Sequence, residues 1–171
     1  ELKRWRERLL KNEKKHENFE QSLPDFLREY QAEGVAWMQH MHNNGGHCLL
    51  ADEMGLGKTL QVLTLIAHCA EFNQSSMIVC PASVVPVWKM EIERWYPKLK
   101  VQILKSDRFP KNEKGVLWLS SYSLLRRHVE QVKTIKFEYL ILDEAQCIKN
   151  PLAKVSQACY ALNGKYRLAI T

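Results

Sequence analysis

A glycine-rich loop between two apolar runs is the part of this sequence with the clearest chemistry. The loop reads, in order, Asp52-Glu53-Met54-Gly55-Leu56-Gly57-Lys58-Thr59. The apolar runs at 48–51 and 60–67 predict a strand before it and a helix after it, so backbone N–H groups point into one concavity at the positive end of a helix dipole. Lys58 can reach the β- and γ-phosphates of a nucleotide, and the Thr59 hydroxyl can bind Mg²⁺. The segment therefore predicts a phosphate-binding loop.

One position departs from the usual form of this loop, G-x-x-x-x-G-K-[ST]. Asp52 stands where the first glycine is expected, whereas the second glycine, the lysine and the threonine are present. A plain glycine turn before a helix is the alternative interpretation. The apolar runs on both sides favour the phosphate loop, because they supply the strand and the helix that such a loop joins.

Two carboxylates at the end of a second apolar run add to this chemistry. Asp143 and Glu144 directly follow the run Tyr139–Leu142, which reads as a short buried strand. Phosphate-loop enzymes hold Mg²⁺ with a carboxylate at this place. We therefore predict that Asp143 binds Mg²⁺, usually through water, and that Glu144 polarises the attacking water. Without the upstream loop, a solvated turn would be the better interpretation of this pair.

The rest of the chain alternates between helical and strand-like patterns, which predicts an α/β fold with a mostly parallel sheet. We expect helices at 26–42, 58–72, 84–95, 121–133 and 152–162, and strands at 47–51, 77–80, 101–104, 116–120, 138–142 and 166–171. Right-handed crossovers place the carboxyl ends of parallel strands at one edge of the sheet. Lys58 and Asp143 are therefore expected to meet, although 85 positions (143 − 58) separate them.

The first 22 residues differ from the rest, and we predict a charged helical lead-in at 1–22 followed by one lobe at 23–171. Lysine and arginine dominate residues 1–20, on a helical pattern with few apolar positions. A solvated helix is the favoured interpretation; a nucleic-acid contact or a brace between domains is the alternative. The chain begins at Glu1 and ends in a strand-like run, so we expect it to be part of a longer protein.

Composition limits the class of protein. The 171 residues are 46% hydrophobic and 26% charged, which is ordinary for a globular domain with a real core. No apolar run approaches the roughly 20 residues that span a bilayer, and the charged N-terminus is unlike a signal peptide. The five cysteines form no C-x-x-C pair, which favours an intracellular location, cytoplasmic in a bacterium or nuclear in a eukaryote. The net charge of +6 favours an anionic partner such as nucleic acid.

Several short motifs follow one another along residues 23–171. They are 27–38 (LREYQAEGVAWM), 50–59 (LADEMGLGKT), 78–83 (IVCPAS) with Trp88 and Glu91, 120–125 (SSYSLL), 143–146 (DEAQ) with 148–151 (IKNP), and 167–171 (RLAIT). As an ordered set they resemble the first RecA-like lobe of a helicase superfamily two ATPase of the Swi/Snf type, in its DEAQ form. Asp52 is normal in the phosphate loop of this family, and the last motif stops before its expected Gly-Thr-Pro. The resemblance implies a three-layer RecA-like lobe.

The resemblance also implies roles for individual residues. Gln31 resembles the glutamine that reads adenine, since its amide offers a donor and an acceptor. The implied nucleotide-binding set is Gln31, Asp52, Glu53, Met54, Gly55, Leu56, Gly57, Lys58 and Thr59. The residues that resemble contacts to the nucleic-acid backbone follow strand ends and are Pro81, Ala82, Ser83, Ser121 and Tyr122. Gln146 and Thr171 resemble residues that couple nucleotide state to nucleic-acid contact.

The implied activity is Mg²⁺-dependent ATP hydrolysis coupled to movement along duplex DNA and remodelling of protein–DNA complexes. A second RecA-like lobe in the parent protein would supply arginine fingers, which are worth roughly 10³–10⁵ in rate in phosphoryl transfer. We therefore expect residues 1–171 alone to bind nucleotide weakly and to hydrolyse it negligibly. Two alternatives remain, a non-catalytic nucleotide- or partner-binding module and an RNA-directed ATPase of a sister family. The segment Ile148–Pro151 favours the Swi/Snf branch.

Two other clusters favour structural roles. The three histidines and the cysteine at 40–48 match no standard zinc spacing, so we do not expect a metal there. Trp88 and Trp95 lie seven positions apart with Ile92 on one helix face. Core packing is the favoured interpretation of this stripe, and a platform for stacking bases is the alternative.

Overall fold

The computed structural model describes residues 19, 22–51, 53, 55–69, 74–111 and 113–171. The predicted helix at 1–20, apart from Phe19, lies outside the described residues. The same holds for Asp52 and Met54 of the glycine loop, so their predicted roles stay predictions.

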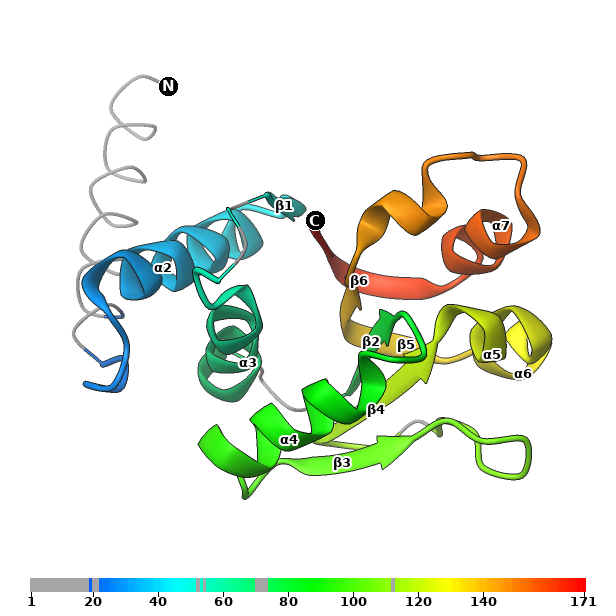
Figure 1. The fold of residues 1–171 in the computed structure, drawn as a ribbon, viewed down its shortest axis with the longest axis horizontal. Helices are drawn as coiled ribbons and strands as arrows, with labels where there is room; N and C mark the ends of the chain where they lie inside the picture. The colour runs from blue at the N-terminus through cyan, green and yellow to red at the C-terminus, as the bar shows by residue number, and fades with distance from the viewer. Residues whose placement is uncertain (1–18, 20–21, 52, 54, 70–73, 112) are drawn as a thin grey trace, which may run out of the picture.

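A six-stranded sheet forms the centre of the lobe, in the order β1-β6-β5-β2-β4-β3 (Figure 1). The strands are β1 (Cys48–Leu50), β2 (Ser75–Cys80), β3 (Lys100–Ile103), β4 (Val116–Ser121), β5 (Lys136–Leu142) and β6 (Asn163–Ile170). Every pair of neighbouring strands is parallel. The predicted α/β fold with a mostly parallel sheet is confirmed.

Helices cover both faces of this sheet, which gives three layers (Figure 1). The helices on one face are α2 (Glu29–Asn43), α3 (Lys58–Cys69) and α4 (Val85–Trp95), and those on the other are α5 (Tyr122–Arg127), α6 (Val129–Val132) and α7 (Lys154–Tyr160). Strand β2 shows how the sheet serves both layers. Ile78 packs into the cluster of α2–α4, whereas Met77 and Val79 pack into the cluster of α5–α7. All of β2 is buried, as expected for a parallel strand covered on both sides.

Most predicted elements differ from the structure by about one to three residues at an end, and the clearest differences lie in the second half of the chain. The helix expected at 121–133 divides at His128, whose φ of −120° and ψ of 25° leave the helical range, into α5 and α6. Of the helix expected at 152–162, only Lys154–Tyr160 is helical, as α7. The pair Asn163-Gly164, expected to end that helix, instead begins β6 and pairs with Lys136 and Phe137 of β5. Tertiary pairing outweighs the local turn preference of Asn-Gly at this point.

Apart from Gln31 on α2, the predicted site residues lie at the carboxyl edge because they stand at or just after the end of a parallel strand. Strand β6 is inserted between β1 and β5, so that Leu168 is paired with Cys48 on one side and Ile141 on the other. Thr171, just after β6, therefore lies between the loop that follows β1 and the acidic pair that follows β5. Position in the sheet alone explains why these three segments converge.

Two further findings concern the described part of the chain. Cys48, Cys80, Cys147 and Cys159 carry free thiols. Among the described residues no helix has the length and apolar character needed to cross a membrane.

Candidate functional site

The phosphate loop has a backbone that only glycine can adopt easily. Gly55 and Gly57 have φ angles of 87° and 75°, in the left-handed region. A Cβ on Gly57 would also lie 2.4 Å from Nε2 of Gln31, so a side chain here would meet a neighbour as well as strain the backbone. Gly57 thus serves both the shape of the loop and its contact with α2.

The carbonyl of Leu56 anchors the loop to two helices. It accepts hydrogen bonds from the Tyr30 hydroxyl at 3.3 Å, from Nε2 of Gln31 at 3.1 Å and from Nε2 of Gln61 at 3.5 Å. Gln31 is only 6% exposed, and its Oε1 accepts a bond from the backbone N–H of Arg28 at 3.0 Å. Both ends of the Gln31 amide therefore have partners within the protein. Its role in reading adenine remains a prediction.

Lys58 and Thr59 are the first two residues of α3 and line one cavity with the acidic pair. The cavity has a volume of about 520 Å³, and its wall includes the phosphate loop, residues of α4, and both Asp143 and Glu144. The Nζ of Lys58 donates a hydrogen bond to the backbone carbonyl of Glu53 at 3.0 Å, within its own loop. As predicted, Lys58 and Asp143 come together in the fold, because both line this cavity.

Asp143 is held by hydrogen bonds on every side of the residue. Its carboxylate accepts a bond from the indole Nε1 of Trp88 at 2.8 Å on Oδ2 and one from the backbone N–H of Glu144 at 2.9 Å on Oδ1. Its backbone carbonyl accepts a bond from the Tyr122 hydroxyl at 2.7 Å, and its N–H donates to the carbonyl of Val79 at 2.8 Å. The position of this carboxylate is fixed by the fold.

The electrostatics of Asp143 suit a cation. Burial raises the pKa of Asp143 above its ordinary value, and the hydrogen bonds from Trp88 and from the Glu144 backbone, with the charge of Lys58, oppose that rise. A partly desolvated carboxylate gains from a bound cation. Its oxygens and the Thr59 hydroxyl are hard ligands, of the kind that Mg²⁺ prefers.

Mg²⁺ also fits the small number of protein ligands here. Among the described residues no group of three or more His, Cys, Asp or Glu side chains could hold a metal ion. Mg²⁺ commonly takes one or two protein ligands and completes its shell with water and substrate phosphates. Asp143 and Thr59, which line the same cavity, could supply two such ligands.

Gln146 connects the acidic turn to the end of β6. Its Nε2 donates to a carboxylate oxygen of Glu144, and its Oε1 accepts a hydrogen bond from the Thr171 hydroxyl at 3.0 Å. Glu144 has φ 52° and ψ 52°, an uncommon conformation for a non-glycine residue and one that clusters at functional sites. The two residues predicted to couple the site to nucleic acid are therefore bonded to each other.

The predicted nucleic-acid residues divide into two groups. Ala82 and Ser83 are exposed at the carboxyl edge, and Pro81 is half-buried. Ser121 Oγ accepts the N–H of Leu124 at 3.2 Å and thereby caps α5. Tyr122 is buried, with its hydroxyl on Asp143. A nucleic-acid contact by Tyr122 would thus have to use its main chain.

Three residues that contact the site in the structure were not predicted from the sequence to belong to it. Tyr30 and Gln61 hold the phosphate loop, and Trp88 bonds to Asp143. The position of Tyr30 directly before Gln31 was a usable signal. Trp88 was named as part of the motif that begins at Ile78, which was a usable signal, but it was assigned to core packing, and its 1% exposure agrees with that packing.

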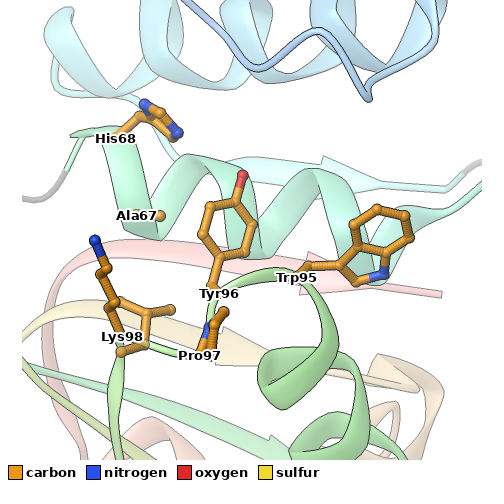
Figure 2. A pocket seen from close by; sticks show the side chains of 7 residues that line it. Ala67, His68, Trp95, Tyr96, Pro97 and Lys98 are labelled. Atoms are coloured by element: carbon orange, nitrogen blue, oxygen red, sulfur yellow. The ribbon is translucent and has the colours of Figure 1, made fainter.

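Trp95, the other tryptophan of that helix, makes contacts within the protein. Its ring lies 5.0 Å from that of Phe26, and its Nε1 donates to Glu91 at 2.9 Å. It lines the site cavity and also a second cavity of about 400 Å³, whose wall includes His68, Tyr96 and Pro97 (Figure 2). The Tyr96 hydroxyl is bonded to Thr64 at 2.8 Å. These contacts support packing as the role of Trp95.

Comparison with known proteins gives consistent matches. The family model described as SNF2-related domain matches residues 30–171. A Mycoplasma pneumoniae protein named uncharacterized ATP-dependent helicase is 36% identical over 156 residues, which is 85% of this chain and 15% of that protein. The ISWI chromatin-remodeling complex ATPase ISW1 of Saccharomyces cerevisiae is 35% identical over 157 residues, 85% of this chain and 14% of that protein. The chain therefore spans only a small part of these relatives.

A solved structure agrees with these matches. The Sulfolobus solfataricus SWI2/SNF2 ATPase core in complex with dsDNA superimposes with a TM-score of 0.77 at 36% identity. The match covers 87% of this chain and 32% of that one.

Proposed function

The chain belongs to the SNF2-related domain family, and we propose that it is the ATP-binding lobe of an enzyme that couples ATP hydrolysis to movement along duplex DNA. One observation carries the proposal: the phosphate loop and the acidic pair line the same cavity. A glycine loop at the start of a helix and a carboxylate at the end of a buried strand are the two parts with which phosphate-loop ATPases bind and hydrolyse a nucleotide.

Each side chain has its own part in the proposed reaction, an in-line attack of water on the γ-phosphate. Lys58 would bind the β- and γ-phosphates and stabilise the charge that develops on them. Glu144 would orient and polarise the attacking water. Asp143 and Thr59 would hold Mg²⁺, which when bound would neutralise charge on the phosphate oxygens.

The coupling of this reaction to DNA is proposed to use Gln146. Its side chain bonds both Glu144, beside the proposed attacking water, and Thr171, after β6. A change in the position of Glu144 during hydrolysis would alter both bonds. Such a shared partner would offer a physical route between the nucleotide and the surface proposed to touch DNA.

Duplex DNA is the proposed track, and remodelling of protein–DNA complexes is the proposed outcome. The solved relative is a complex with dsDNA, and another relative is named as a chromatin-remodelling ATPase. In this chain Ala82 and Ser83 are exposed just after β2, and the net charge is +6. Small exposed residues and main-chain N–H groups at strand ends can contact the phosphates of the DNA backbone, and such contacts do not depend on the base sequence.

The lobe is proposed to need a partner lobe from the same parent protein. That lobe would supply arginine fingers, and their absence would cost roughly 10³–10⁵ in rate. The 171 residues alone should therefore hydrolyse ATP negligibly. Robust DNA-stimulated turnover by this chain alone would contradict the requirement.

The test is the ATPase activity of the full-length protein with and without duplex DNA, beside Lys58→Ala and a control, Lys133→Ala. Lys133 pairs with Glu130 on the helical layer that lies away from α3. We expect DNA to raise turnover, Lys58→Ala to lower it by at least about 10²-fold, and the control to match wild type. If DNA does not change ATP turnover, or if Lys58→Ala keeps wild-type turnover, a non-catalytic nucleotide- or partner-binding module would be the better interpretation. Competition between duplex DNA and RNA would identify the track.

A further inference from the structure

We propose that Trp88 is a positioning residue for the metal-binding carboxylate: its indole N–H holds Asp143 in the orientation that binds Mg²⁺. The inference rests on the proposed function, since it concerns the same site. Trp88 touches neither metal nor nucleotide in this proposal and acts through Asp143 alone.

The hydrogen bond between them is a long-range contact built by the sheet. Trp88 lies on α4, which directly follows β2, and Asp143 directly follows β5. Strands β2 and β5 are neighbours, and Val79 pairs with Leu142, so the first turns of α4 lie beside the end of β5. The indole Nε1 then reaches Oδ2 of Asp143 at 2.8 Å across 55 positions of sequence.

This bond completes the restraint of the carboxylate group. The Glu144 N–H holds Oδ1 at 2.9 Å, and that donor moves with the same turn as Asp143. Trp88 is the donor to Oδ2, and it stands on a different helix, where its side chain is packed into the core. A carboxylate accepts about four hydrogen bonds, so two donors leave acceptor sites for the water shell of a cation. Fixing the rotation of the carboxylate while leaving those sites is what an outer partner of a metal ligand does.

Packing alone does not require this contact. Trp118 on β4 is as buried as Trp88, each with 1% of its surface exposed. The Nε1 of Trp118 has no hydrogen-bond partner among the described residues. The fold therefore tolerates a buried tryptophan with an unbonded N–H, so burial does not by itself account for the bond between Trp88 and Asp143. A positioning role for Trp88 accounts for this bond.

Trp118 also gives the matched control for an experiment. Trp88→Phe and Trp118→Phe each remove a buried indole N–H and leave a similar cavity, but only the first removes a donor to Asp143. The experiment measures the affinity of the full-length protein for a fluorescent, non-hydrolysable ATP analogue, at saturating Mg²⁺ and in EDTA. The ratio of the two dissociation constants reports how strongly Mg²⁺ and nucleotide support each other. It is independent of turnover.

We expect Trp88→Phe to reduce this ratio by about tenfold, with little change of affinity in EDTA, because loss of an outer partner weakens metal binding by roughly 10–100-fold. Trp118→Phe should keep the wild-type ratio. Benzothienylalanine at position 88, which replaces only the N–H by sulfur, should behave like Trp88→Phe and serves if the phenylalanine variant does not fold.

Two results would overturn the inference in different ways. If wild type binds nucleotide with Mg²⁺ support and the benzothienylalanine variant keeps that ratio within about twofold, Trp88 is a packing residue only, and the proposed function stands. If wild type shows no Mg²⁺-supported nucleotide binding, the proposed function itself fails, and the inference fails with it.

Discussion

The phosphate loop and the acidic turn face one cavity, but the chain builds them in different ways. The phosphate loop depends on its own backbone: Gly57 has φ 75°, and Lys58 begins the helix that follows. The acidic turn depends on distant residues, since Asp143 accepts bonds from Trp88 and Tyr122, 55 and 21 positions earlier. The backbone shape of the loop is therefore set locally, with α2 anchoring it through Leu56, whereas the place of the Asp143 carboxylate depends on the fold.

This difference predicts how each region fails. A change in the phosphate loop should act directly on its conformation and on nucleotide binding. A change in the acidic turn should leave nucleotide binding by the loop in place, but should impair metal binding, the positioning of the attacking water or the response to DNA. Mutations that separate binding from turnover test this distinction.

The largest expected effect is that of Glu144→Gln on turnover. Glutamine keeps the size of the side chain but cannot polarise water, so DNA-stimulated ATP hydrolysis by the full-length protein should fall by about 10²–10⁴-fold. Nucleotide affinity should stay near wild type, because the phosphate loop is unchanged. Steady-state ATPase assays and a fluorescent-nucleotide titration would measure the two quantities.

The control for this change is Glu93→Gln, an exposed glutamate paired with Lys89 on α4, which should behave as wild type. Loss of nucleotide binding in Glu144→Gln would break the comparison, since the acidic turn would then support the loop. Unchanged turnover would exclude the proposed role of Glu144.

A smaller effect is expected for Gly57→Ala on the stability of the lobe. Alanine in the left-handed region costs about 1–2 kcal/mol. The added Cβ would also meet Nε2 of Gln31 and weaken its bond to Leu56, at about 1 kcal/mol more. Urea unfolding of the chain would measure the total.

Gly45→Ala is the matched control for this strain. Gly45 has the same φ of 75°, and a Cβ there would meet nothing within 4 Å. Its substitution should therefore show the backbone cost alone. Equal destabilisation by the two variants would mean that the contact between Gln31 and the loop contributes nothing.

The smallest effect is a pH dependence at the far end of α2, the helix that anchors the phosphate loop. Burial, with the nearby charge of Lys165, lowers the pKa of His42 from 6.5 to about 4. His42 also bonds the Tyr139 hydroxyl and lies against Tyr166. The folded state therefore disfavours protonation, so its stability should fall as the pH drops from 6.5 towards 4, by about 1 kcal/mol after allowance for partial exposure.

His42→Gln should flatten this part of the pH dependence in urea unfolding measured between pH 7 and 4. Burial lowers the pKa of His68 as well, but His68 is present in both proteins, so the difference between them isolates His42. Identical slopes for the two proteins would contradict the assignment.

The sequence by itself determined the α/β class, the parallel sheet and the glycine loop between β1 and α3. The periodicity of apolar residues shows which positions of a helix or strand are buried, and therefore predicts the element. The Gly-x-Gly-Lys-Thr spacing sets the backbone shape of the loop within five residues. The same patterns predicted one continuous helix across His128 and placed the start of the last strand about three residues too late. The start of β6 depends on which strand lies alongside, as the pairing of Asn163 with Lys136 shows.

Only the tertiary structure decided what holds the acidic pair. An Asp-Glu dipeptide has no conformation of its own that marks it as a site. Its surroundings come from the order of the strands, which places β2 on one side of β5 and β6 on the other. That order brings Trp88 to the carboxylate of Asp143 and Thr171 to Gln146. Hydrogen bonds across such distances in sequence follow from the packing of whole elements, and no short motif encodes them.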